Sequence, residues 1–156
     1  DSLGSRGLGD VYKRQGLTIG LGTDSAASNN RLSLFDTLRH AALLAKHENR
    51  QADKLAADQA LQLATLGGAQ ALGIDAHTGS ISVGKQADLI TVDCTAPAMQ
   101  PVHNPVSQLV YTDCSAAVDN VWVAGQQLVS NRSLLTLNQN DIIEQAQLWQ
   151  QQIQNS

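Results

Sequence analysis

Asp24 is the residue of this 156-residue chain whose position most suggests chemistry. It follows an apolar run, Leu17 to Leu21 (LTIGL), whose strand-forming residues predict a buried β-strand. A carboxylate just beyond the C-terminal end of a buried strand stands where barrel enzymes place catalytic groups, so Asp24 could bind a metal ion and accept a proton. The alternative is that Asp24 caps the following loop by accepting backbone N–H groups, a frequent role of Asp in turns.

The histidines offer no obvious complement to Asp24. The chain has four, His40, His47, His77 and His103, and none forms a His-x-His pair. His40 and His47 lie about two turns apart on one expected helix, and we interpret them as partly exposed helix residues. A catalytic zinc needs about three protein ligands, so we expect the chain by itself to be catalytically inactive.

The segment that follows the Asp24 loop predicts two helices. Ser33, with Asp36 placed as in a capping box, precedes apolar residues at helical spacing, so strand, loop and helix make one βα unit. A second helical pattern comes after a polar stretch and ends at glycines. The expected positions are Leu34 to Ala45, then Ala57 to Leu66 with a break at Gly67-Gly68, then a short turn closed by Gly73 as a left-handed C-cap.

From His77 onward, β-branched residues and turn formers predict short strands joined by tight turns. A final amphipathic helix is expected from Asp141 to Ile153. The expected strands are Ile81 to Val83, Leu89 to Val92, Gln108 to Tyr111, Val118 to Val123 and Gln127 to Val129, with Ala124-Gly125 as a hairpin turn, Asn140 as the N-cap of the last helix, and Trp122 and Trp149 as packing anchors.

A single βα unit cannot stand alone, because both edges of its strand would be unpaired. We therefore expect parallel neighbours to come from residues upstream of Gly16, in a longer polypeptide that is called the parent protein below. Residues 1–15 (DSLGSRGLGDVYKRQ) show neither helical nor strand periodicity, and we interpret them as a non-native or disordered tail. A native flexible arm is the alternative.

Four ordered motifs resemble one known family. The stretch Gly22 to Asn30 (GTDSAASNN), followed by Leu34-Phe35 and Leu43-Leu44, closely resembles the last barrel strand and loop of the amidohydrolase superfamily. The nearest branch is the methylthioadenosine/S-adenosylhomocysteine deaminase and triazine hydrolase group. The other stretches that agree in order and spacing are Ala64-Thr65 with Gly68-Ala69 and Ala71 to Gly73; Gly79 to Ile81 with Gly84-Lys85 and Ala87 to Ile90; and Asn104 to Val106 leading to Leu109 to Tyr111.

The resemblance implies an α/β plus β fold: the C-terminal end of a (β/α)8 TIM barrel in residues 16–75, part of an accessory β-sandwich in 76–137 and a C-terminal helix in 138–156. It also implies that the KQAD turn, Lys85 to Asp88, lies in this sandwich, so we expect the turn to be structural, with Asp88 at the start of a strand. It implies that Asp24 binds the catalytic divalent metal, zinc foremost, and handles a proton of the attacking water. The implied reaction is hydrolytic deamination of a purine-like or other nitrogen-heterocyclic amine. The family's other ligands, a His-x-His pair and two single histidines on strand ends, have no counterpart here.

Composition narrows the remaining classes. The basic residues are scattered and the net charge is −4, so a nucleic-acid partner is not expected. Every apolar stretch is shorter than the ~20 residues that span a bilayer, so we expect no membrane partner. Cys94 and Cys114 are interpreted as buried reduced thiols, which fits a cytoplasmic location. Self-association stays open, and a non-catalytic β-rich binding or interaction module is the competing hypothesis.

Overall fold

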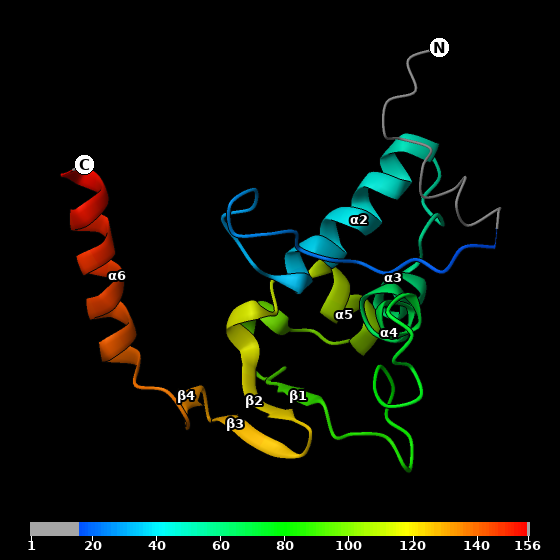
Figure 1. Ribbon diagram of the computed structural model, residues 1–156. Coiled ribbons are helices and arrows are strands. Elements are labelled where there is room, and N and C mark those ends of the chain that lie inside the picture. The colour runs from blue at the N-terminus through cyan, green and yellow to red at the C-terminus, as the bar shows by residue number, and fades with distance from the viewer. Residues whose placement is uncertain (1–15, 156) are drawn as a thin grey trace.

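The computed structural model describes residues 16–155, so the interpretation of residues 1–15 lies outside them. Helices α2 to α5 cluster together, a small sheet lies beside them, and α6 stands apart from both (Figure 1). The helices are α2 Leu34–Asn49, α3 Ala57–Ala64, α4 Leu66–Ala71, α5 Pro105–Tyr111 and α6 Gln139–Gln154; the strands are β1 Leu89–Val92, β2 Val118–Val123, β3 Gln126–Ser130 and β4 Ser133–Leu134; the 3-10 turns are η2 Pro97–Met99 and η3 Ser115–Ala117.

Helix α2 begins as the sequence predicts. The Ser33 hydroxyl accepts the Asp36 backbone N–H at 3.3 Å, which satisfies one of the free donors of the first turn. Leu38 and Ala42 face inward and are 2% and 0% exposed. They pack with Ala60 of α3 and with α5, so the hydrophobic core of the described residues lies among these three helices.

Helix α5 contradicts the strand that we expected from Gln108 to Tyr111. The Asn104 side chain accepts the backbone N–H groups of Val106 and Ser107, and Pro105 occupies the first turn. An Asn N-cap followed by Pro is a strong helix start, because Pro has no N–H to leave unsatisfied. These local signals, and burial of Val110 against α2, outweigh the strand propensity of the apolar run.

The helical break expected at Gly67-Gly68 is also misplaced. The helix is interrupted at Thr65, and both glycines lie inside α4. Gly73 takes the predicted left-handed conformation, with a φ of 71°. The glycines serve close packing: a Cβ added at Gly20 would lie 2.6 Å from the Cα atom of Gly68, too near for any side chain. The segment before Asp24 can therefore lie directly on α4.

The strands form a four-stranded antiparallel sheet in the order β1-β2-β3-β4. Ala124 and Gly125 have φ of 49° and 80°, which confirms the expected hairpin turn between β2 and β3. The strand expected at Ile81 to Val83 is wrong, because Ile81 and Val83 are 89% and 108% exposed and pair with nothing described. The small sheet agrees with part of the expected sandwich, and no second layer lies among residues 16–155.

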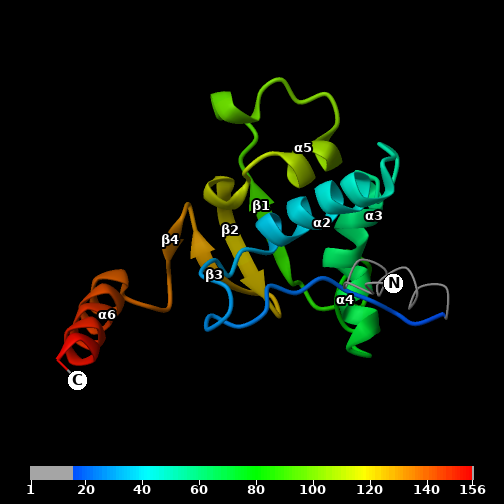
Figure 2. The same cartoon turned by 90° about the horizontal axis from the view of Figure 1, so that it is seen from above.

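Helix α6 extends from the end of the sheet without packing on it (Figure 2). Its N-cap is Asn138, not the predicted Asn140, since the Asn138 side chain accepts the Asn140 N–H. None of its residues is buried, and Trp149, expected as a packing anchor, is 64% exposed. Within the described part of the chain, α6 and the other helices all fall short of the length and apolarity needed to cross a membrane.

Asp88 confirms the structural interpretation of the KQAD turn. Asp88 lies directly before β1. Its carboxylate accepts hydrogen bonds from the Ala124 N–H at 2.7 Å and from the Thr78 hydroxyl at 2.7 Å. It thus joins the loop before the sheet to the β2–β3 turn. The bond from Ala124, and then the bond from Thr78, hold the pKa of Asp88 below its ordinary value.

This lowered pKa predicts an acid-dependent stabilisation. Because the carboxylate binds its proton less readily in the folded than in the unfolded state, its contribution is complete above the ordinary Asp pKa and is lost as the pH falls through the folded pKa. We expect Asp88→Ala to lower the thermal unfolding midpoint of the parent protein at about pH 7 and to lower it by less at a pH below the ordinary Asp pKa of ~3.9. Midpoints that differ equally at both pH values would contradict an ionic role for Asp88.

Candidate functional site

Asp24 lies in an exposed loop between an extended segment and α2. Residues 17–21 form no assigned strand, and their contact with the helices includes a bond from the Leu21 N–H to the Leu63 carbonyl at 3.1 Å. A barrel strand is defined by pairing with parallel neighbours, which residues 16–155 do not supply to this segment. The eighth barrel strand therefore stays a prediction for the parent protein.

The backbone at Asp24 has an unusual conformation. Its φ is 63°, in the left-handed region that most non-glycine residues avoid and that Asp and Asn tolerate best. Its carboxylate accepts the Ser25 N–H at 2.6 Å, and the Thr23 hydroxyl donates to its carbonyl at 3.1 Å. The cap interaction that we weighed as an alternative is thus present. It does not compete with metal binding, because carboxylate ligands are themselves usually hydrogen-bonded.

These bonds also set the charge of the Asp24 side chain. The Ser25 N–H, and then the Ser28 hydroxyl, hold the pKa of Asp24 below its ordinary value. The carboxylate is therefore ionised at neutral pH, as a metal ligand or proton acceptor must be. Its exposure at the surface of the described residues leaves it accessible to groups from the rest of a larger protein.

The loop that carries Asp24 is closed by bonds from Asn29. The Asn29 backbone N–H donates to the Ser25 carbonyl at 2.9 Å, and the Asn29 amide donates to the Thr23 carbonyl at 2.8 Å. From the sequence, a role was assigned to Asp24 and no contact to Asn29. An Asn within a short polar loop was the available signal, because its amide often bonds to nearby backbone.

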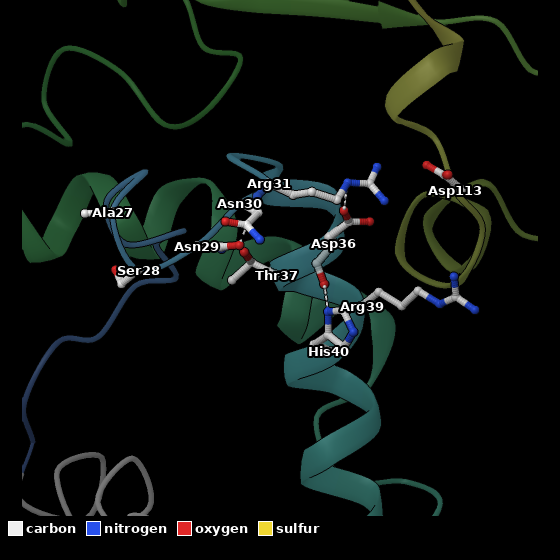
Figure 3. A pocket seen from close by; sticks show the side chains of 10 residues that line it. All are labelled: Ala27, Ser28, Asn29, Asn30, Arg31, Asp36, Thr37, Arg39, His40 and Asp113. Carbon is white, nitrogen blue, oxygen red and sulfur yellow. Dashed lines mark hydrogen bonds and ion pairs between the residues drawn. The ribbon is translucent and has the colours of Figure 1, made fainter. Parts of the chain in front are cut away.

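A polar cavity of about 580 Å³ adjoins this loop and the first turns of α2 (Figure 3). Arg31 pairs with Asp36 at 3.0 Å, and the His40 Nδ1 atom lies 2.8 Å from the Asp36 carbonyl. Asp24 is not among the residues that line the cavity, so the cavity is separate from the carboxylate expected to do chemistry. The lining residues are Ala27, Ser28, Asn29, Asn30, Arg31, Asp36, Thr37, Arg39, His40 and Asp113.

The described residues contain no complete set of metal ligands. Residues 16–155 contain no group of three or more His, Cys, Asp or Glu side chains placed to hold an ion. His40 lies within α2 and lines the cavity, which agrees with its interpretation as a helix residue. Cys114 is fully buried beside Met99, and burial raises the pKa of its thiol, so it is not an activated nucleophile. Asp24 thus fits the role of a single carboxylate ligand whose partners would come from elsewhere.

Comparison with known proteins identifies the family. The model of the amidohydrolase family matches residues 2–128. The chain belongs to the amidohydrolase family. Among curated relatives of this amidohydrolase chain, a 5-methylthioadenosine/S-adenosylhomocysteine deaminase of Teredinibacter turnerae is 47% identical over 90% of the chain and 32% of that protein. The group suggested by the sequence motifs is therefore confirmed, and the chain spans about a third of the length of the curated relatives that it matches.

Solved structures agree with the family. An adenosine deaminase from Xanthomonas campestris with bound zinc superposes with a TM-score of 0.88 and 41% identity, over 92% of this chain and 33% of that one. An atrazine chlorohydrolase from Arthrobacter aurescens, in complex with zinc, superposes with a TM-score of 0.78 and 30% identity, over 88% of this chain and 30% of that one. The described residues thus have an amidohydrolase-like arrangement.

Proposed function

We propose that this chain is the C-terminal part of a zinc-dependent aminohydrolase that removes the amino group from the purine ring of an adenosine-type nucleoside. The observation that carries the proposal is the 47% identity, across 90% of the chain, to a 5-methylthioadenosine/S-adenosylhomocysteine deaminase. A 5'-deoxyadenosine deaminase of Methanosphaera stadtmanae, 40% identical over 91% of the chain, supports the same substrate class. The shared part of these substrates is the adenine ring with its exocyclic amine.

In the parent protein, Asp24 would serve as one metal ligand and as a proton acceptor. A divalent cation, when bound, brings the pKa of water toward ~7. Asp24 would take a proton from the attacking water, while the water oxygen forms a bond to the amino-bearing ring carbon. Breaking the carbon–nitrogen bond then releases ammonia, with the proton returned to the leaving nitrogen. The net change is replacement of the amine by oxygen at the cost of one water.

A substrate panel tests the proposed function. The zinc-loaded parent protein should release ammonia from 5-methylthioadenosine, S-adenosylhomocysteine or 5'-deoxyadenosine in amounts equal to the nucleoside consumed. Atrazine is the informative comparison, because a chlorohydrolase is also among the structural neighbours, at a lower identity of 30%. Chloride release from atrazine without nucleoside deamination would overturn the proposed substrate class. Failure to hydrolyse any of these compounds would favour the non-catalytic binding module.

A further inference from the structure

The feature that carries a further inference is the Asn29 side chain, which bridges the two sides of the Asp24 loop. Asn29 is half-buried, whereas the residues from Asp24 to Ser28 are all exposed. Its amide nitrogen donates to the Thr23 carbonyl at 2.8 Å, and its amide oxygen accepts the Arg31 backbone N–H at 3.1 Å. An amide offers a donor and an acceptor at once, so one side chain makes both contacts.

The contact at Thr23 acts on the peptide plane that leads into Asp24. The Thr23 carbonyl and the Asp24 nitrogen belong to one planar unit, so holding that carbonyl fixes the plane from which the Asp24 φ is measured. Asp24 adopts a φ of 63°, which a free loop would leave readily. Because φ sets the direction of the Asp24 Cα–Cβ bond relative to this peptide plane, a contact that holds the plane also restricts where the Asp24 side chain starts.

The contact at Arg31 connects the same amide to a rigid element. The Arg31 guanidinium pairs with the Asp36 carboxylate at 3.0 Å, and Asp36 lies in the first turn of α2. Figure 3 shows Asn29, Arg31 and Asp36 next to one another at this end of the helix. These contacts connect the Asp24 turn to the first turn of α2 as well as to its own loop. A precisely placed functional group needs such support from a regular element.

We propose that Asn29 is a positioning residue, which holds Asp24 in its left-handed conformation and aims its carboxylate at the metal and water of the parent protein. This inference rests on the proposed function. Asn29 itself would touch neither substrate nor metal. Its effect would pass entirely through the Thr23–Asp24 peptide.

The test compares Asn29→Ala with a matched control, Asn49→Ala, in the zinc-loaded parent protein. Asn49 also donates its amide to a backbone carbonyl, that of Ala45, at the same 2.8 Å. It lies at the far end of α2, about 20 Å along the helix axis from the first turn, so its removal costs a similar bond without touching the Asp24 loop.

For Asn29→Ala we expect kcat to fall ~10–100-fold with KM changed less than about threefold, because an orienting partner of a ligand is lost while the substrate pocket is kept. Zinc should also be lost to a competing chelator ~10-fold faster. Asn49→Ala should change neither value. Both variants should be folded at the assay temperature, with the unfolding midpoint lowered somewhat more by Asn29→Ala, which loses two bonds, than by Asn49→Ala, which loses one. If Asn29→Ala matches Asn49→Ala in kcat and zinc loss, Asn29 is merely structural and the inference is overturned.

A second variant protects the test against misfolding. Asn29→Asp keeps the shape and the acceptor for the Arg31 N–H, but it replaces the donor to the Thr23 carbonyl by an oxygen and adds a negative charge, so a fall in kcat at least as large is expected. Asp24→Asn, measured in parallel, separates the two proposals. A severe Asp24→Asn defect with a harmless Asn29→Ala defeats only the positioning role, whereas a harmless Asp24→Asn defeats the role of Asp24 and the positioning role together.

Discussion

Replacing Asp24 by Asn in the parent protein should lower turnover by at least ~100-fold, because a general base typically contributes ~100–10,000-fold and a metal ligand is weakened as well. Asn is the appropriate replacement. It has the size of Asp, tolerates the left-handed φ of 63° nearly as well, and keeps an oxygen to accept the Ser25 N–H. What it lacks is the negative charge and the ability to take up a proton.

Steady-state kinetics and metal analysis of the same preparation check this expectation. Zinc content should fall only in part, since the histidines expected elsewhere in the parent protein would still hold the ion. Asp88→Asn is the matched control, because Asp88 also accepts a backbone N–H, at 2.7 Å, with a pKa held below its ordinary value. It should leave turnover unchanged. Turnover of Asp24→Asn within threefold of the unchanged protein would make Asp24 a loop cap and nothing more.

Features with a complete local signal were predictable from the sequence. The pair Ser33 and Asp36 predicts the start of α2, because the Ser33 hydroxyl and the Asp36 N–H that it accepts lie three residues apart. The left-handed conformations of Gly73 and Gly125 likewise follow from the tolerance of glycine for positive φ, although Ala124, in the same turn as Gly125, takes its φ of 49° against its own preference. The signal for the α2 start and for both glycines is contained within a few residues of the chain.

Features decided by distant packing were not predictable in the same way. The helix over Gln108 to Tyr111 belongs here only in part, because its Asn104-Pro105 start is a local signal, whereas the packing of the apolar run against α2 is not. Gly67 and Gly68 look like helix breakers, yet they lie within α4 because residues 17–21 pack closely on it. That contact joins residues far apart in sequence, so no local pattern contains it.

In the candidate site, too, local features were predictable from the sequence and features that depend on the folded loop were not. Asp24 was found because its place after an apolar run and the GTDSAASNN motif are both local features. The bond from Asn29 to the Thr23 carbonyl was not found, because its geometry depends on the complete path of the loop between them. No group of three or more potential ligand side chains lies among the described residues, so the further metal ligands that we propose would come from the rest of the parent protein.

Zinc binding by the 156-residue chain alone should therefore be very weak. Apparent zinc-binding free energies of ~10–16 kcal/mol in structural sites come from several ligands acting together, and a submicromolar site requires more than about 8 kcal/mol. One exposed carboxylate gives no chelate, and residues 16–155 contain no group of three or more His, Cys, Asp or Glu side chains placed to hold an ion. We expect affinity at least ~1,000-fold below that of the parent protein.

Isothermal titration of the chain with zinc, beside the parent protein and beside the chain carrying Asp24→Asn, measures this difference. The two versions of the chain should give indistinguishable weak binding, because removing one unsupported ligand changes little when no site exists. The parent protein should bind one zinc tightly and lose affinity with the same substitution. A one-to-one submicromolar site in the chain that disappears with Asp24→Asn would show that the chain holds a full ligand set, and the division of the metal site between this chain and the rest of the parent protein would be wrong.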